Sequence, residues 1–389
     1  MNLPVHGGDL ADVAERYGVA AAGLLDFSAN INPLGPPPSV VRAMQNALGS
    51  PISLAPYPHP TALPLRCALA AKHETHADGI VVANGSSATI DAAVRAFGAR
   101  GCVLPIPAFS EYERALNAAG AAIYRVGLND LFVPRIDSIE EMFARSGARL
   151  CLLSHPHNPS GVIYELDLLI ELYALCTRYG AMLALDEAFI DYAPERSLIG
   201  EASRLPNLIV LRSLTKFYGI AGVRIGYAVA SEANAAAMRA VLPTWSVGVL
   251  DIAAALAAID DEAFAQTTLA TNQEAREHLR ERLTAAGTLV YQSAANFLLV
   301  ELPISAESMD AFLHRLVVDF QIVVRDTRSY DGLATRSCIR VAVRTPSENE
   351  RLVAAIESLL DVTALGRSPG ARAEVVKNIE SGCVGAVDA

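Results

Sequence analysis

The chain has 389 residues and 52% of them are apolar, so it exceeds one ordinary hydrophobic core and suits a globular protein of two domains. It carries 31 basic and 42 acidic side chains, a formal charge of −11, whereas nucleic-acid-binding proteins usually present a basic surface. The six cysteines form no CxxC pair, the N-terminus lacks a signal-peptide pattern, and no apolar run reaches the ~18 residues of a membrane span. We therefore expect a cytoplasmic protein with reduced thiols, without a nucleic-acid or membrane partner.

The first segment, residues 1–45, is predicted to be an arm that lies across another domain or subunit. It contains a short helix over 10–17, and four prolines between 33 and 38 favour an extended chain. Residues 46–245 then alternate short apolar runs with helical stretches, such as the amphipathic helix expected at 87–98. Strands are expected at 79–85, 101–107, 122–128, 149–156, 182–189 and 208–214. Because these runs are apolar on successive residues, they predict an α/β domain with a doubly wound, mostly parallel sheet.

The pattern changes after residue 245. Alanine-rich helices are expected over 251–286, and they are followed by strands at 296–302, 321–326 and 338–344 and helices at 307–318 and 347–361. This order predicts a smaller α+β domain over 246–362. Residues 363–389 are rich in Gly, Ser and Ala without periodicity, so we predict a disordered tail.

The segment SLTKFYGIAGVRIGY, residues 213–227, is the most informative for chemistry. Lys216 stands in a glycine-bearing loop after a strand, where a plain solvated lysine is the alternative. A lysine that binds an aldehyde covalently needs a rigid strand-to-loop junction and must lose its proton. Ser213 and Arg224 lie close enough in sequence to reach a phosphate. Together these residues are what an aldehyde cofactor, held by its phosphate and its carbonyl, requires.

Two further polar residues follow apolar runs at predicted strand ends, where ligands of such sheets bind. Asp186 in LALDEAFIDY is either a capping or salt-bridged aspartate or the partner of the pyridine nitrogen of pyridoxal 5′-phosphate (PLP). Asn158 in LSHPHNPSG is either an ordinary Asn-Pro turn or a hydrogen-bond donor to the cofactor's ring oxygen. His155 and His157 flank it, but no other ligand cluster accompanies them, so no metal site is expected.

Weaker signals fit the same cofactor. The first backbone N–H groups of the helix at Ser86, Ser87 and Ala88 can bind a phosphate, although an ordinary serine cap is the alternative. Phe109 can stack on a pyridine ring or be a core aromatic residue. Tyr57 lies in the rigid stretch PYPHP and can equally be a surface tyrosine.

Taken together, the motifs HPHNPSG, LDEAFID, SLTKFYGIAGVRIGY and RVAVRTPSENERL resemble the fold-type I PLP enzymes, in the histidinol-phosphate aminotransferase branch, over about residues 1–362. Within that branch, HGGDLADVAERYG, LLDFSANINPLGPP and LRSLTKFYGIAGVRIGY are most similar to the threonine-phosphate decarboxylases of cobalamin synthesis. Aminotransferases of the branch usually lack the leading HGG and carry a tyrosine where this chain has Phe189. The resemblance thus implies an aspartate-aminotransferase-like PLP fold and favours decarboxylation of L-threonine O-3-phosphate.

The resemblance also implies site residues and partners. Lys216 and Asp186 would be catalytic. The cofactor would be held by Ser86, Ser87, Ala88, Phe109, Asn158, Asp186, Ser213, Lys216 and Arg224, and by Tyr57 from the neighbouring subunit of a homodimer. A phosphorylated amino acid would be bound by His6, Gly7, Asn30, Asn158, Arg325 and Arg340. Transfer of an amino group from histidinol phosphate or a similar amine, and ligand binding without turnover, remain the alternatives.

Overall fold

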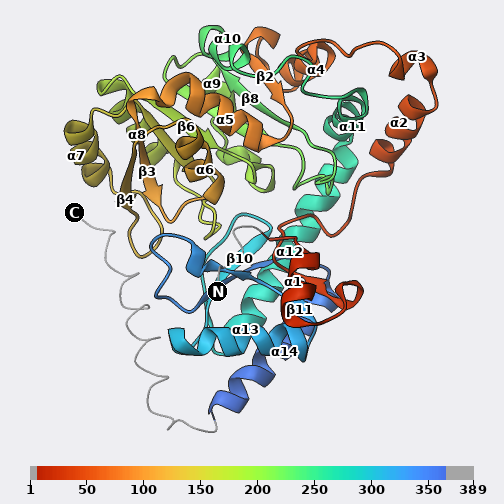
Figure 1. The fold of residues 1–389 in the computed structure, drawn as a ribbon, viewed down its shortest axis with the longest axis vertical. Helices are drawn as coiled ribbons and strands as arrows, with labels where there is room; N and C mark the ends of the chain where they lie inside the picture. Colours follow the sequence, from red (N-terminus) through yellow and green to blue (C-terminus); the bar gives the residue numbers. More distant parts are fainter. Residues whose placement is uncertain (1–6, 365–389) are drawn as a thin grey trace.

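The computed structural model describes residues 7–364, so His6 and the predicted tail from residue 365 onward lie outside the described residues. Figure 1 shows a large layered α/β part and a smaller part built around β10, α13 and α14. Between the described ends, no helix is both long and apolar enough to cross a membrane. The domain limits at 45, 245 and 362 stay predictions.

A seven-stranded sheet forms the centre of the large part, in the order β2-β8-β7-β6-β5-β3-β4. Its strands are β2 (Ile80–Ala83), β3 (Cys102–Ile106), β4 (Ile123–Gly127), β5 (Leu150–Ser154), β6 (Met182–Asp186), β7 (Leu208–Ser213) and β8 (Gly226–Ala230). Neighbours pair in parallel except β8, which runs antiparallel to both β2 and β7. The six predicted strands are confirmed with small differences at their ends. The sequence analysis missed β8.

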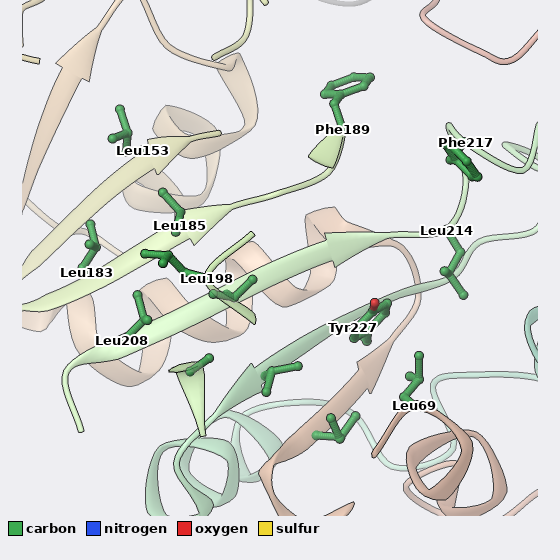
Figure 2. Close-up of a cluster of buried hydrophobic side chains, with 14 of the residues drawn as sticks. Leu69, Leu153, Leu183, Leu185, Phe189, Leu198, Leu208, Leu214, Phe217 and Tyr227 are labelled. Atoms are coloured by element: carbon green, nitrogen blue, oxygen red, sulfur yellow. The ribbon is translucent and has the colours of Figure 1, made fainter. Parts of the chain in front are cut away.

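Helices cover both faces of this sheet. They are α4 (Leu63–Lys72), α5 (Ser86–Phe97), α6 (Ser110–Ala118), α7 (Ile136–Ser146), α8 (Leu166–Arg178), α9 (Ile199–Ala202) and α10 (Glu232–Ala240). Successive strand residues point to opposite faces, so alternate residues enter two separate cores. Leu183 and Leu185 belong to the cluster drawn in Figure 2, whereas Ala184 between them packs with the residues of α5 and α6. This double burial explains why the inner strands β5, β6 and β7 are apolar on successive residues up to their polar ends.

The smaller part contains a second sheet, in the order β12-β13-β10-β9, whose strands all pair antiparallel. These strands are β9 (Leu289–Val290), β10 (Phe297–Glu301), β12 (Arg325–Asp326) and β13 (Cys338–Ala342). The associated helices are α12 (Glu262–Ala285), α13 (Met309–Val318) and α14 (Pro346–Ala364). Their apolar faces and those of β10 and β13 form a core of their own.

The segment 321–326, predicted as one strand, is two short strands in different sheets. β11 (Ile322–Val323) pairs in parallel with β1 (Leu25–Asp26), while β12 pairs with β13. The N-terminal arm therefore lies on the smaller part, where Figure 1 shows α1 (Leu10–Tyr17) beside β11. The helix predicted at 10–17 is confirmed.

The proline-rich arm leads from the smaller part to the large one. Pro38 does not extend the arm but begins α2 (Pro38–Leu48), because a proline at the first helical position loses no hydrogen bond. After α2 comes the single turn α3 (Pro51–Leu54), and α2 packs against α11 (Val249–Asp260). The arm thus passes the carboxyl edge of the large sheet on its way.

Candidate active site

Three neighbouring strands end in polar residues at one edge of the large sheet. β5 ends at Ser154 and β6 at Asp186, and these two residues are direct partners in the parallel ladder. β7 ends at Ser213, three residues before Lys216. The backbone N–H of His155 donates to the Asp186 carbonyl at 2.8 Å and so joins the loop that carries Asn158 to this edge. The structure therefore brings the predicted Asp186, Asn158, Ser213 and lysine loop together.

Asp186 is buried, with 5% of its surface exposed, and its carboxylate accepts two hydrogen bonds. The Tyr112 hydroxyl donates to Oδ2 at 2.7 Å, and the Ala188 N–H donates to Oδ1 at 3.1 Å. Burial nevertheless raises the pKa of Asp186 to about 6, against the lowering by these two bonds. Asp186 forms no ion pair with a described residue, so a cationic ring nitrogen would complete its bonding.

Tyr112 is a site residue that the sequence analysis missed. It lies in the first turn of α6, is 1% exposed, and its ring meets that of Phe109 edge to face at 5.7 Å. A tyrosine three residues after Phe109 on an amphipathic helix is typical of a core position, so its spacing gave no signal of a bond to Asp186. Phe109 itself is half-buried just before α6, beside this pair.

Asn158 is held in one orientation. Its N–H donates to Ser154 Oγ at 2.9 Å, and its Oδ1 accepts a hydrogen bond from Arg340 Nη1 at 2.7 Å. Because Oδ1 faces the arginine, the amide NH₂ faces the other way. This orientation makes the NH₂ group available as a donor to a ligand.

Lys216 is half-buried, and its pKa is lowered to about 8 by burial and, secondarily, by the charges of Arg340 and Arg224. At pH 7 about a tenth of the amine is therefore unprotonated, far more than for an ordinary lysine, and a nucleophilic lysine requires this neutral form. The backbone around it is fixed by Asn32, which the sequence analysis did not single out. The Asn32 N–H donates to the Lys216 carbonyl at 3.1 Å, and Asn32 Nδ2 donates to the Phe217 carbonyl at 2.7 Å.

The start of α5 meets β8 and Arg224 in a tight cradle. A Cβ atom on Gly226 would lie 2.4 Å from Ser86 N, and one on Gly85 would lie 2.7 Å from Arg224 Nη2. Gly226 is also the ladder partner of Ser213, whose hydroxyl lies 2.8 Å from that of Thr215. The N–H groups of Ser86 and Ser87 at the start of α5, an arginine and a serine hydroxyl thus converge, which is a geometry that binds phosphate. The predicted Ala88 N–H instead donates to the Gly85 carbonyl at 3.1 Å.

A second group of cations lies where the smaller part faces this edge. Arg325 and Arg340 are direct cross-strand partners in β12 and β13, and both are buried. Besides Asn158, Arg340 donates to the Ser28 carbonyl at 3.0 Å. Gly7 packs closely on that carbonyl: a Cβ atom added to Gly7 would lie 2.2 Å from the Ser28 carbonyl oxygen. The buried Asn30 follows two residues later, and no hydrogen bond reaches its Oδ1 from the described residues.

Two predicted residues are not part of this arrangement in the single chain. Tyr57 is 82% exposed and packs on Trp245, with ring centroids 5.0 Å apart. His6 lies outside the described residues. Within the described chain, no group of three or more His, Cys, Asp or Glu side chains is arranged to hold a metal ion.

The arrangement fits PLP in each of its functional groups. Lys216 offers a partly neutral amine to the aldehyde, and the cradle at Ser86 offers donors to the phosphate. Asp186 offers a buried carboxylate to the ring nitrogen, and Asn158 an amide donor to the ring oxygen. Residues that satisfy all four groups therefore meet at one edge of one sheet.

Comparisons with known proteins agree with this geometry. Residues 22–356 match the family model described as aminotransferase class I and II. The chain is 37% identical to the threonine-phosphate decarboxylase of Salmonella typhimurium, covering 91% of this chain and 96% of that protein. It is 32% identical to the histidinol-phosphate aminotransferase of Haloferax volcanii, covering 90% and 93%.

Among solved structures, the histidinol-phosphate aminotransferase of Sinorhizobium meliloti in complex with pyridoxal-5′-phosphate superposes with a TM-score of 0.82 at 24% identity. The match covers 92% of this chain and 96% of that one, which establishes the shared fold. The fold predicted from the sequence is therefore confirmed. The chain belongs to the aminotransferase class I and II family and is a PLP-dependent enzyme.

Proposed function

We propose that the enzyme decarboxylates L-threonine O-3-phosphate to CO₂ and (R)-1-amino-2-propanol O-2-phosphate. The second product would supply the aminopropanol unit of cobalamin. The observation that carries the proposal is the pair of buried arginines, Arg325 and Arg340, on facing strands beside Asn158. The 37% identity with a threonine-phosphate decarboxylase supports it. The carboxylate and the phosphate of this substrate would each bind one of the two guanidinium groups.

The arginine pair is hard to explain by folding alone. Two like charges directly opposite each other on paired strands destabilise a sheet, and buried charges are costly unless they are paired. No carboxylate of the described residues lies within ion-pair distance of Arg340, and burial lowers its pKa. A substrate with two anions removes both penalties at once, because each guanidinium binds an oxyanion with two parallel hydrogen bonds.

The order of the two arginines suggests which anion each one binds. Arg340 donates to Asn158, and its charge helps to lower the pKa of Lys216, so it lies nearer the reacting centre. Its ligand is therefore the carboxylate, which is attached to the reacting carbon. Arg325 is one strand further out and binds the phosphate together with His6, Gly7 and Asn30. Fixed anchors on both sides of the reacting carbon would orient the carboxylate for cleavage.

The family cofactor would be held by Lys216, Asp186, Asn158, Phe109 and the phosphate cradle at Ser86, Ser87, Ser213 and Arg224. When bound, PLP withdraws electrons from the bond that stands perpendicular to its ring at the reacting carbon. The negative charge of Asp186 keeps the ring nitrogen protonated and so maintains that withdrawal. Lys216 Nζ returns a proton to the carbon from which CO₂ has left.

Amino transfer is the second candidate, because several relatives, including the one from Haloferax volcanii, are histidinol-phosphate aminotransferases. Glutamate would also fit two arginines, since it carries two carboxylates. Phe189 argues for decarboxylation: it is buried and packs edge to face on Phe297, with ring centroids 5.0 Å apart. The hydroxyl that aminotransferases of this branch place there is missing.

The same proposal includes a homodimer with Tyr57 directed to the neighbouring cofactor phosphate. Its support is a set of exposed apolar side chains within residues 34–57, on the arm, on α2 and α3 and just after α3: Leu34, Val41, Leu48, Ile52, Leu54 and Tyr57. Of these, Val41 and Leu54 line an apolar groove between α2 and α11. A second copy would cover this surface, whereas a monomer would leave it in water. A mass of one chain in analytical ultracentrifugation would contradict the dimer. Its cytoplasmic location stays a prediction.

The decisive experiment supplies two substrates separately to the purified enzyme. L-Threonine phosphate should release one CO₂ per molecule consumed. Histidinol phosphate with 2-oxoglutarate should give little glutamate. If glutamate forms in the second mixture and no CO₂ in the first, the enzyme is an aminotransferase and the proposal is wrong.

A further inference from the structure

Tyr330 contacts both arginines of the substrate side. Its hydroxyl accepts a hydrogen bond from Arg340 Nη1 at 3.3 Å, and the Arg325 guanidinium lies over its ring, 5.3 Å from the centroid. Next to it, the Ser329 hydroxyl accepts from Arg325 Nη2 at 2.7 Å. These two consecutive residues thus contact the two guanidiniums through different groups.

The ring of Tyr330 is itself held firmly. It is 5% exposed and packs with Phe132, Leu299, Leu333 and Cys338 in a small buried cluster. Its backbone is fixed in a turn, since its N–H donates to the Thr327 carbonyl and its own carbonyl accepts from the Leu333 N–H, each at 3.0 Å. A side chain fixed in this way can set the distance and angle between the two guanidiniums.

A neutral residue suits this position better than an acidic one. A carboxylate between the arginines would pair with them and compete with the substrate's own anions. Tyrosine offers Arg340 one acceptor and offers Arg325 the negative face of its ring, and it adds no negative charge of its own. The phenol proton also remains to donate to the anion that Arg340 binds.

We propose that Tyr330 is a specificity-determining positioning residue, which spaces Arg325 and Arg340 for a substrate that carries a carboxylate and a phosphate. This inference rests on the proposed function and deepens it. Through its hydroxyl, Tyr330 fixes Arg340 and thereby the direction of the carboxylate. Through its ring it supports Arg325, and the Ser329 hydroxyl supports Arg325 by a hydrogen bond. Loss of the hydroxyl alone therefore disturbs the carboxylate and spares the phosphate.

The test compares the holoenzyme with its Tyr330→Phe variant, with Ser329→Ala as the matched control. Affinities for L-threonine phosphate and for inorganic phosphate are measured from the absorbance change of the bound cofactor, which requires no turnover. Tyr330→Phe should weaken the affinity for L-threonine phosphate about tenfold, because one hydrogen bond to a charged group is lost. The affinity for inorganic phosphate should change by less than about twofold. Ser329→Ala should weaken the affinities for both ligands by the same factor, because it acts on Arg325, to which the phosphate of each ligand binds.

A second readout separates positioning from packing. If the wild type releases CO₂, the fraction of turnovers that end in amino transfer should rise in Tyr330→Phe. A loosely held carboxylate allows the reacting carbon to lose its proton in place of CO₂. Tyr330→Leu removes the ring as well, so it should also weaken inorganic phosphate. The inference fails if Tyr330→Phe binds both ligands like the wild type, or weakens both equally. Absence of CO₂ from the wild type would overturn the proposed reaction, while the two affinities would still decide the role of Tyr330.

Discussion

Replacing Asp186 by asparagine should make the cofactor-free enzyme more stable above pH 6 while it abolishes most of the turnover. Asp186 is buried beside Tyr112 without a cationic partner among the described residues, and burial raises its pKa from 3.8 to about 6. In the absence of PLP, the folded protein must therefore hold an uncompensated buried carboxylate at neutral pH. Asparagine keeps the shape and removes the charge, at the expense of the electrostatic role in catalysis.

The size of the effect follows from the pKa shift. The folded-state pKa lies above the unfolded one, so the folded protein binds this proton more tightly and is stabilised fully at pH values below about 4. That stabilisation is lost as the pH rises through about 6. A shift of about two units at 1.36 kcal/mol per unit corresponds to about 3 kcal/mol at pH 8 and about half of that at pH 5.

Urea unfolding of the cofactor-free wild type and Asp186→Asn at pH 5 and pH 8 measures this difference directly. A control is Asp130→Asn, because Asp130 is exposed in the loop after β4 and its charge is solvated. The control should change the free energy of unfolding by less than about 0.5 kcal/mol at either pH. The reasoning is refuted if Asp186→Asn is no more stable than the wild type at pH 8, or if its advantage does not depend on pH.

Three further changes test the site. Lys216→Ala should leave no lysine that borohydride can link to the cofactor, and a pyridoxyl label on any other lysine in a peptide map would contradict the assignment. Tyr112→Phe removes a hydrogen bond to the ionised form of Asp186 and should raise the pKa of that carboxylate further, so kcat should reach its plateau at a higher pH; an unchanged pH profile would exclude this role. Arg325→Ala should raise the KM for L-threonine phosphate at least about tenfold in a CO₂ assay, and an unchanged KM would show that the phosphate binds elsewhere.

The elements of the fold could be predicted from local patterns, but some of their partners could not. Strands β5, β6 and β7 are buried at every position and apolar on successive residues up to their polar ends, because both faces of the sheet are covered, and this pattern is visible in sequence. β8 is harder to predict because its first two residues, Gly226 and Tyr227, are also the last two of the lysine motif, and only three apolar residues follow them. The break at Val324 depends on β1, which lies some 300 residues earlier in the chain, so no local pattern contains it.

Some residues of the site could likewise be predicted from the sequence and others could not. Lys216, Asp186 and Asn158 follow predicted strands, and the geometry of parallel sheets brings such ends together. Tyr112, Tyr330 and Asn32 gave no signal, because a single aromatic residue among polar neighbours and an asparagine before proline are common without function. Their importance comes from which residue lies opposite each of them, and only the tertiary structure contains that information.

The charges of the site explain how a protein with a formal charge of −11 can act on an anion. Burial lowers the pKa of Lys216 and the charges of Arg340 and Arg224 lower it further, so the lysine is a weak base while the site is empty. An anion bound to Arg340 cancels part of that effect, because the lysine then faces a neutral pair instead of a cation. Lys216 thus becomes a stronger base when the substrate has bound, and it can hold the proton that it must later return. A titration of the Lys216 amine in cofactor-free enzyme should give a higher pKa with a bound carboxylate ligand than without it, and equal values would refute this coupling.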